Sequence, residues 1–168
     1  YKRQHSISLS SLAILTALRM NVDKQVIHDI GVGCLLHDIG LRYTTLDYEG
    51  KSMEDMNPEA LAEYKKHPVY GYTSVKDEEW ISDEVKKIIL YHHERLDGTG
   101  YPFGKTAAEL NTQERMMACI DIYQALTESR PYKQGMSHEK ACEILWDMAK
   151  KVWLDETIVK QVEDCFRG

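Results

Sequence analysis

The segment from His92 to Pro102, HHERLDGTGYP, carries residues that could hold a metal ion. It joins two adjacent histidines and a glutamate to a glycine-rich turn that tyrosine and proline close. Imidazole is the side chain most often used to bind transition metals, and glycine lets the backbone bend tightly or approach a ligand closely. Two adjacent histidines are hard to explain by core packing, since a buried imidazole needs partners for both nitrogens. The segment therefore favours a metal site.

A histidine–aspartate pair, His37 and Asp38, lies upstream and is followed by Ile39 and Gly40. Imidazole and carboxylate together suit iron, manganese or zinc better than calcium or magnesium. A carboxylate can also bridge two metals with one oxygen on each. Taken alone, the pair is better explained as the polar end of a helix, but the two downstream histidines make a shared metal site the better interpretation.

Three further polar residues are candidates for the same site. Asp121 interrupts the otherwise apolar segment 116–122, where a carboxylate is costly to bury unless it is paired or bound to a metal. An aspartate at a helix edge, bonded to a neighbour, explains this position equally well. With His5 and His67 added, we expect one metal site assembled from scattered helices.

The elements that must position these residues follow a helical pattern nearly throughout. Val85, Ile88, Ile89 and His92 fall at i, i+3, i+4 and i+7, so His92 should point toward the same interior as the apolar side chains. We expect an all-α bundle of about seven or eight helices, with loops at about 41–57, 94–107 and 128–136. The expected helices span about residues 6–20, 23–38, 58–66 and 67–77, and others begin near 83, 111, 137 and 155.

The bulk composition fits one globular domain, and we expect residues 1–168 to form it. The net charge of −6 argues against binding of a DNA or RNA polymer or an anionic membrane, since these need a basic face. It does not exclude a small anionic ligand, because metal ions can reverse the local potential.

The cysteine pattern and the absence of targeting segments indicate a cytoplasmic protein. The four cysteines form no C-x-x-C pair, so they are better explained as core thiols than as zinc ligands. No apolar run approaches the roughly 20 residues that span a bilayer, and no secretory leader is present. Because the chain opens at Tyr1 without a methionine, we expect it to be a fragment of a longer sensor or regulator.

Together these residues closely resemble the HD-GYP domain, a family within the HD superfamily of metal-dependent phosphohydrolases. The resemblance runs from about His5 to Lys133, and its long motif at 92–102 is specific, whereas the histidine–aspartate pair alone indicates only the superfamily. The matching positions are His5-Ser6, His37-Asp38-Ile39-Gly40, His67-Pro68, His92-His93-Glu94, Asp97-Gly98-Thr99-Gly100-Tyr101-Pro102, Asp121 and Arg130-Pro131-Tyr132-Lys133.

The resemblance implies an all-α HD-domain bundle that hydrolyses cyclic di-GMP, or a related cyclic dinucleotide, to pGpG or GMP. It implies two divalent metal ions, usually iron or manganese, with zinc and nickel as further candidates. His37 and Asp38 would be catalytic, with Asp38 bridging the ions, and Tyr101, Arg130 and Lys133 would bind substrate. Partners would be the cyclic dinucleotide, a second copy in a homodimer, or an upstream sensory domain. The implied metal ligands are His5, His37, Asp38, His67, His92, His93 and Asp121.

Two departures from the family pattern matter, at Leu41 and Tyr1, and a third, at Gln124, carries little weight. The family commonly has lysine directly after His-Asp-Ile-Gly, where this chain has Leu41 followed by Arg42. Losing that cation should weaken phosphate binding. Tyr1 stands where members with three metals have glutamate, which favours two metals, and Gln124 replaces a frequent acidic residue.

Two other functions remain open at this level. The first is a binding or signalling module that keeps the metal site but has lost turnover; Leu41 favours it, whereas the intact His37 and Asp38 argue against it. The second is a general nucleotide phosphohydrolase of the HD superfamily, which the intact Gly100-Tyr101-Pro102 loop argues against.

Overall fold

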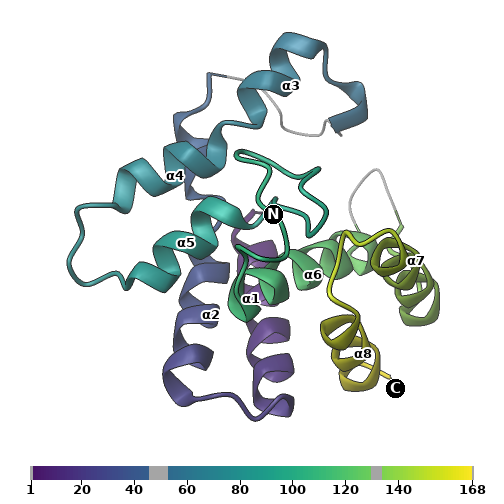
Figure 1. The fold of residues 1–168 in the computed structure, drawn as a ribbon. Coiled ribbons are helices and arrows are strands. Elements are labelled where there is room, and N and C mark those ends of the chain that lie inside the picture. Colours follow the sequence, from purple (N-terminus) through teal and green to yellow (C-terminus); the bar gives the residue numbers. More distant parts are fainter. Residues whose placement is uncertain (1, 46–52, 130–133, 168) are drawn as a thin grey trace.

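The computed structural model describes residues 2–45, 53–129 and 134–167, and these residues fold into a helical bundle without a β-strand (Figure 1). The predicted all-α bundle is confirmed. The described elements are the α-helices α1 (Lys2–Arg19), α2 (Lys24–Leu36), α3 (Pro58–Tyr64), α4 (His67–Val75), α5 (Asp83–Tyr91), α6 (Thr112–Thr127), α7 (His138–Lys150) and α8 (Glu156–Cys165), and the 3-10 helices η1 (Ile39–Tyr43) and η2 (Met53–Asp55).

The helix boundaries follow local capping signals in the sequence. Asn111 and Glu114 form a reciprocal capping box at the start of α6, and the side chains of Asn57 and Ser82 accept hydrogen bonds from the first turns of α3 and α5. The start of α2 differs, because Asp23 occupies the N-cap position but its carboxylate accepts no hydrogen bond from the first turn.

The long helices α1 and α2 lie side by side at one side of the bundle (Figure 1). Leu9, Ala13 and Ala17 repeat every four residues along one face of α1, and all three are fully buried. The Ser10 hydroxyl donates a hydrogen bond to the Gly31 carbonyl across the pair. This packing places His5, near the start of α1, beside the end of α2.

The main core joins α1 and α2 to α5, α6, α7 and α8, and a smaller apolar cluster lies between the end of α4 and α5. Three of the four cysteines are buried, and all four are free thiols, as expected for core positions. Three histidines, His37, His67 and His92, are as deeply buried as the largest core residues. A buried imidazole needs polar partners, so these residues mark the polar centre of the fold.

Gly40 lets η1 pass directly against α4. A Cβ atom at this position would lie 1.8 Å from the carbonyl oxygen of His67 and 2.5 Å from the backbone nitrogen of Gly71. Only glycine fits such a backbone contact. The close crossing brings the end of α2, with His37 and Asp38, next to the first residue of α4.

The segment 94–107 is a loop, as predicted, and the C-terminal part of the chain braces it. The Leu96 amide donates a hydrogen bond to the Trp153 carbonyl, which lies between α7 and α8. Arg115 of α6 donates to the Ala107 carbonyl and pairs with Asp155 at 2.9 Å. These contacts hold the loop against α6 and the segment between α7 and α8. Among the described residues, no helix combines the length and apolar character needed to cross a membrane.

Candidate metal centre

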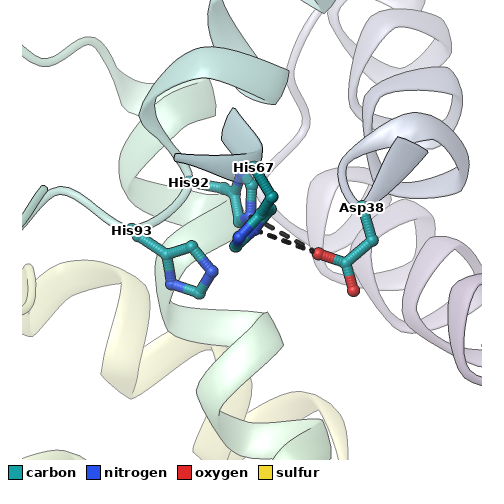
Figure 2. A group of neighbouring side chains, drawn as sticks. All are labelled: Asp38, His67, His92 and His93. Atoms are coloured by element: carbon teal, nitrogen blue, oxygen red, sulfur yellow. Dashed lines mark hydrogen bonds and ion pairs between the residues drawn. The ribbon is translucent and has the colours of Figure 1, made fainter. Parts of the chain in front are cut away.

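Four side chains from three elements converge on one point. Asp38 follows α2, His67 opens α4, and His92 and His93 follow α5; one ligand atom of each lies within 4.8 Å of the others. The Asp38 Oδ1 atom is 3.4 Å from His67 Nε2 and 3.7 Å from His92 Nε2. Figure 2 shows these carboxylate and imidazole groups facing one another, with His93 beside them. We call these residues the first group.

A second group lies next to the first and combines His5, His37 and Asp121, whose ligand atoms are again within 4.8 Å of one another. The Asp121 Oδ1 atom is 3.6 Å from His5 Nε2 and 3.9 Å from His37 Nε2. The three residues come from α1, the end of α2 and α6. Helices far apart in the sequence thus supply one compact cluster.

Asp38 connects the two groups. Its Oδ2 atom lies 3.2 Å from His37 Nε2 in the second group, while its Oδ1 atom faces His67 and His92 in the first. The two oxygens of one carboxylate are therefore directed at different groups. A carboxylate in this position can serve two neighbouring cations at once.

Backbone carbonyls fix the orientation of the buried imidazoles. The Nδ1 atoms of His37, His67 and His92 lie 2.7, 2.7 and 2.8 Å from the carbonyl oxygens of Cys34, Tyr64 and Ile89, each three residues earlier. A carbonyl only accepts, so Nδ1 carries the hydrogen and a neutral ring leaves Nε2 with a free lone pair. This is the arrangement in which histidines bind metal ions.

His5 is oriented in a similar way by Glu128. Its Nδ1 atom lies 3.0 Å from Glu128 Oε2, while its Nε2 atom faces Asp121. The Gln124 side-chain amide donates to the His5 carbonyl at 2.9 Å. A carboxylate on the far nitrogen fixes the ring and raises its basicity. Glu128 was missed in the sequence, although it lies seven residues after Asp121, on the same helical face.

The Nε2 atoms of His67 and His92 face each other at 3.2 Å. When both Nδ1 atoms carry hydrogen, neutral rings place two lone pairs against each other. The third atom at this point, Asp38 Oδ1, is also an acceptor. Three acceptors that converge without a donor repel one another, and a cation among them removes the repulsion. This set of donor atoms, in which nitrogen predominates, therefore fits a divalent transition-metal ion.

The charges of the cluster shift the pKa of its members in opposite directions. Burial lowers the pKa of His37, but Asp38 and Asp121 outweigh this effect and raise it to about 9. Burial raises the pKa of Asp38, but His37 and the other histidines bring it well below its usual range. For His93, burial and the neighbouring His92 both lower the pKa, so its ring stays neutral.

The loop after His93 folds back over the first group. The Tyr101 ring stacks on the His93 ring, with centroids 4.6 Å apart and planes 17° from parallel. The Tyr101 amide donates to the His93 carbonyl at 3.1 Å. Gly100 allows this approach, because a Cβ atom there would lie 2.5 Å or less from the backbone of residues 93–95.

Glu94 fixes the same loop through hydrogen bonds to its backbone. Its buried carboxylate accepts hydrogen bonds from the Phe103 amide at 2.8 Å and the Lys105 amide at 2.9 Å. Two charge-assisted hydrogen bonds to a buried carboxylate fix the loop strongly. The glutamate beside two histidines is visible in the sequence, but its loop partners depend on the turn geometry.

The structure brings together all seven residues predicted as metal ligands, and Tyr101 contacts one of them. Arg130 and Lys133, predicted to bind substrate, lie outside the described residues, as does Tyr1. Leu41 is buried, with 7% of its surface exposed, so this position contributes no cation to the centre. The assignment of the seven clustered residues as metal ligands remains a prediction, and their geometry indicates which of them would share an ion.

Comparison with known proteins places this fold and cluster in one family. A model of the HD domain matches residues 2–158. A solved HD-GYP-type structure from Bdellovibrio bacteriovorus, Bd1817, superposes with a TM-score of 0.82 at 25% identity and covers 100% of this chain and 53% of that one. The chain belongs to the HD-domain family and, within it, to the HD-GYP group.

Two curated relatives carry names that describe an activity. The chain is 34% identical over 141 residues to the cyclic di-GMP phosphodiesterase PA4108 of Pseudomonas aeruginosa, covering 84% of this chain and 34% of that protein. It is 30% identical over 150 residues to the 3′3′-cGAMP-specific phosphodiesterase 1 of Vibrio cholerae, covering 84% and 32%. The chain thus spans about a third of the length of these relatives.

Proposed function

We propose that this chain is a single metal-dependent phosphodiesterase domain that hydrolyses cyclic di-GMP or a related cyclic dinucleotide. The product would be the linear dinucleotide pGpG or, after a second cleavage, GMP. The observation that carries the proposal is the convergence of His67 Nε2, His92 Nε2 and Asp38 Oδ1, three acceptors within 3.2–3.7 Å of one another. The names of the curated relatives support the substrate class.

Each group would hold one divalent ion, iron or manganese by the donor set. His67, His92 and His93 would bind the first, His5, His37 and Asp121 the second, and Asp38 both. When bound, a pair of such ions would neutralise phosphate charge and lower the pKa of a water molecule, which then loses a proton and supplies hydroxide for attack on phosphorus. The carbonyl-bound imidazoles would keep this geometry without reorganisation, because their Nδ1 atoms are already held.

A phosphodiester is anionic, so the chain's own carboxylates must not repel it. Asp38 and Asp121 face histidines, so bound metal ions held among these residues would neutralise the carboxylate charge before a phosphate approaches. The stacked Tyr101 and the loop held by Glu94 would form one wall of the substrate site and limit access of bulk water.

A second candidate is a module that binds a cyclic dinucleotide without cleaving it. The observation that favours it is the buried Leu41, where the family commonly has a lysine. The candidates differ in one outcome, because only the enzyme releases a linear product.

The test is incubation of anaerobically purified, metal-loaded protein with cyclic di-GMP, cyclic di-AMP and 3′3′-cGAMP, with products identified by mass spectrometry. We expect pGpG or GMP from cyclic di-GMP, or the linear product of the hybrid dinucleotide, and none after chelator treatment. Metal-loaded protein that binds a dinucleotide but leaves it intact would support the binding module. Protein that neither binds nor cleaves any of the three would exclude both functions.

A further inference from the structure

Lys65 carries an ammonium next to the Tyr101 ring and has no acidic partner among the described residues. It follows the last residue of α3 and stands two positions before His67. Its ammonium lies 5.5 Å from the centroid of the Tyr101 ring, and its side chain makes no ion pair within the described part of the chain. The neighbouring Lys66 differs, because its ammonium pairs with Glu63 at 3.0 Å in solvent. Two adjacent lysines thus have different surroundings.

Tyr101 has an unsatisfied polar atom at the same place. Its hydroxyl is buried and has no hydrogen-bond partner among the described residues. A buried donor without a partner costs about 1–3 kcal/mol, so such groups in native proteins call for an explanation, and a ligand is one. The ring itself is fixed by stacking on His93, so the position of the hydroxyl is set by the fold.

The end of α3 and the loop meet over the first group. The Tyr64 ring contacts the His67 ring at 4.9 Å between centroids, and its carbonyl holds His67 Nδ1. Lys65, the next residue, reaches Tyr101, whose ring lies against His93. Tyr101, which contacts His93, thus links the Lys65 ammonium to the first group.

We propose that Lys65 adds a phosphate-binding subsite to the site of the cyclic dinucleotide, together with the hydroxyl of Tyr101, a residue that the family resemblance already implies to bind substrate. A cyclic dinucleotide has two phosphates, and the reaction at the metal centre engages one of them. The subsite takes the other, through the ammonium charge and a hydrogen bond from the hydroxyl. The subsite would supply a cation to the substrate. This matters because the family commonly has lysine at the position of the buried Leu41. This inference rests on the proposed function.

Three variants and a matched control test the subsite. Lys65→Ala removes the charge, Lys65→Arg keeps it, and Tyr101→Phe removes only the hydroxyl while the ring can still stack on His93. Lys66→Ala is the control, since Lys66 belongs to the same turn but pairs with Glu63. The readouts are metal content, KM and kcat for cyclic di-GMP, and the Kd of a phosphorothioate analogue that resists cleavage.

We expect Lys65→Ala and Tyr101→Phe each to raise the Kd of the analogue about tenfold, as loss of a charge-assisted hydrogen bond does, with metal content unchanged. KM should rise with it and kcat should change less. Lys65→Arg should recover most of the affinity, and Lys66→Ala should bind like the unmodified chain. Equal binding by Lys65→Ala and Lys66→Ala, in a chain that cleaves cyclic di-GMP, would overturn the subsite alone. An unmodified, metal-loaded chain that neither binds nor cleaves would overturn the subsite together with the proposed function.

Discussion

His67 and His92 point their Nε2 atoms at each other across 3.2 Å, although both rings use Nδ1 to donate to a backbone carbonyl. The two imidazoles cannot satisfy each other in their neutral forms. The arrangement is stable when a cation lies between them, and Asp38 supplies the negative charge that favours it.

Asp38→Asn should remove the connection between the two groups. An amide has no charge and directs at most one oxygen at a metal, so we expect metal content to fall below half of the unmodified value. Hydrolysis of cyclic di-GMP should fall by more than about a hundredfold, because metal catalysis supplies several kcal/mol of transition-state stabilisation. The matched control is Asp29→Asn, a buried aspartate of α2 bonded to Gln25. Unchanged metal content and turnover in Asp38→Asn would refute the bridging role.

Glu94→Gln should loosen the loop over the first group. The substituted amide accepts from only one of the Phe103 and Lys105 amides and leaves the other without its acceptor. We expect the free energy of unfolding to fall by about 1–3 kcal/mol, measured by urea denaturation of the metal-loaded protein. Glu109→Gln is the control, since Glu109 also accepts a loop amide but has 49% of its side chain exposed. Equal effects of the two variants would show that burial of Glu94 contributes nothing.

Gly40→Ala should separate η1 from α4. The added Cβ meets backbone at 1.8 Å, which no rotamer change relieves, so we expect a loss of about 3 kcal/mol or more in stability together with loss of metal. Gly31→Ala is the matched control within α2. Its Cβ would meet the flexible Ile14 side chain at 3.0 Å, and alanine is the better helix former, so its stability should change little. A stable, metal-binding Gly40→Ala variant would contradict the close crossing.

The metal-free protein should lose stability as the pH rises above neutral. The folded-state pKa of His37 is about 9, above its ordinary value of 6.5. Protonated His37 therefore stabilises the fold fully below pH 6.5, and this contribution of up to about 3 kcal/mol disappears as the pH rises through 9. Urea denaturation of chelator-treated protein between pH 6.5 and 9.5 measures the slope.

His37→Gln should flatten that slope, whereas His28→Gln should not, because His28 is 67% exposed. The pKa values of His92 and His93 are lowered in the fold, so these residues have the opposite effect on stability. Both resist protonation, and the free energy of unfolding therefore falls as the pH drops below 6.5. Stability of the metal-free protein that stays constant from pH 6.5 to 9.5 would rule out the charged His37 between Asp38 and Asp121.

The sequence predicted the helices and the members of the cluster because local signals specify both. The apolar face of Val85, Ile88 and Ile89 correctly placed His92 in the interior, where 1% of its surface is exposed. Residue type alone made the histidines and Asp121 candidates. The division into two groups could not be predicted, because it depends on the crossing of η1 and α4 at Gly40.

The roles that the sequence did not reveal depend on tertiary contacts. Lys65 looks like Lys66 in the chain, and only the packing of α3 against the loop separates their surroundings. Glu94 and Glu128 are ordinary surface types by composition, yet one holds backbone amides and the other a histidine ring. Such roles depend on distances between segments, which periodicity does not report.

The most direct test is a crystal structure of anaerobically purified protein with anomalous scattering recorded at the iron and manganese absorption edges. Two peaks should lie one in each group, both bound by Asp38, with metal–nitrogen distances of about 2.0–2.2 Å. No peak at either group after loading with these metals, with His67 and His92 joined by a hydrogen bond, would contradict the metal centre.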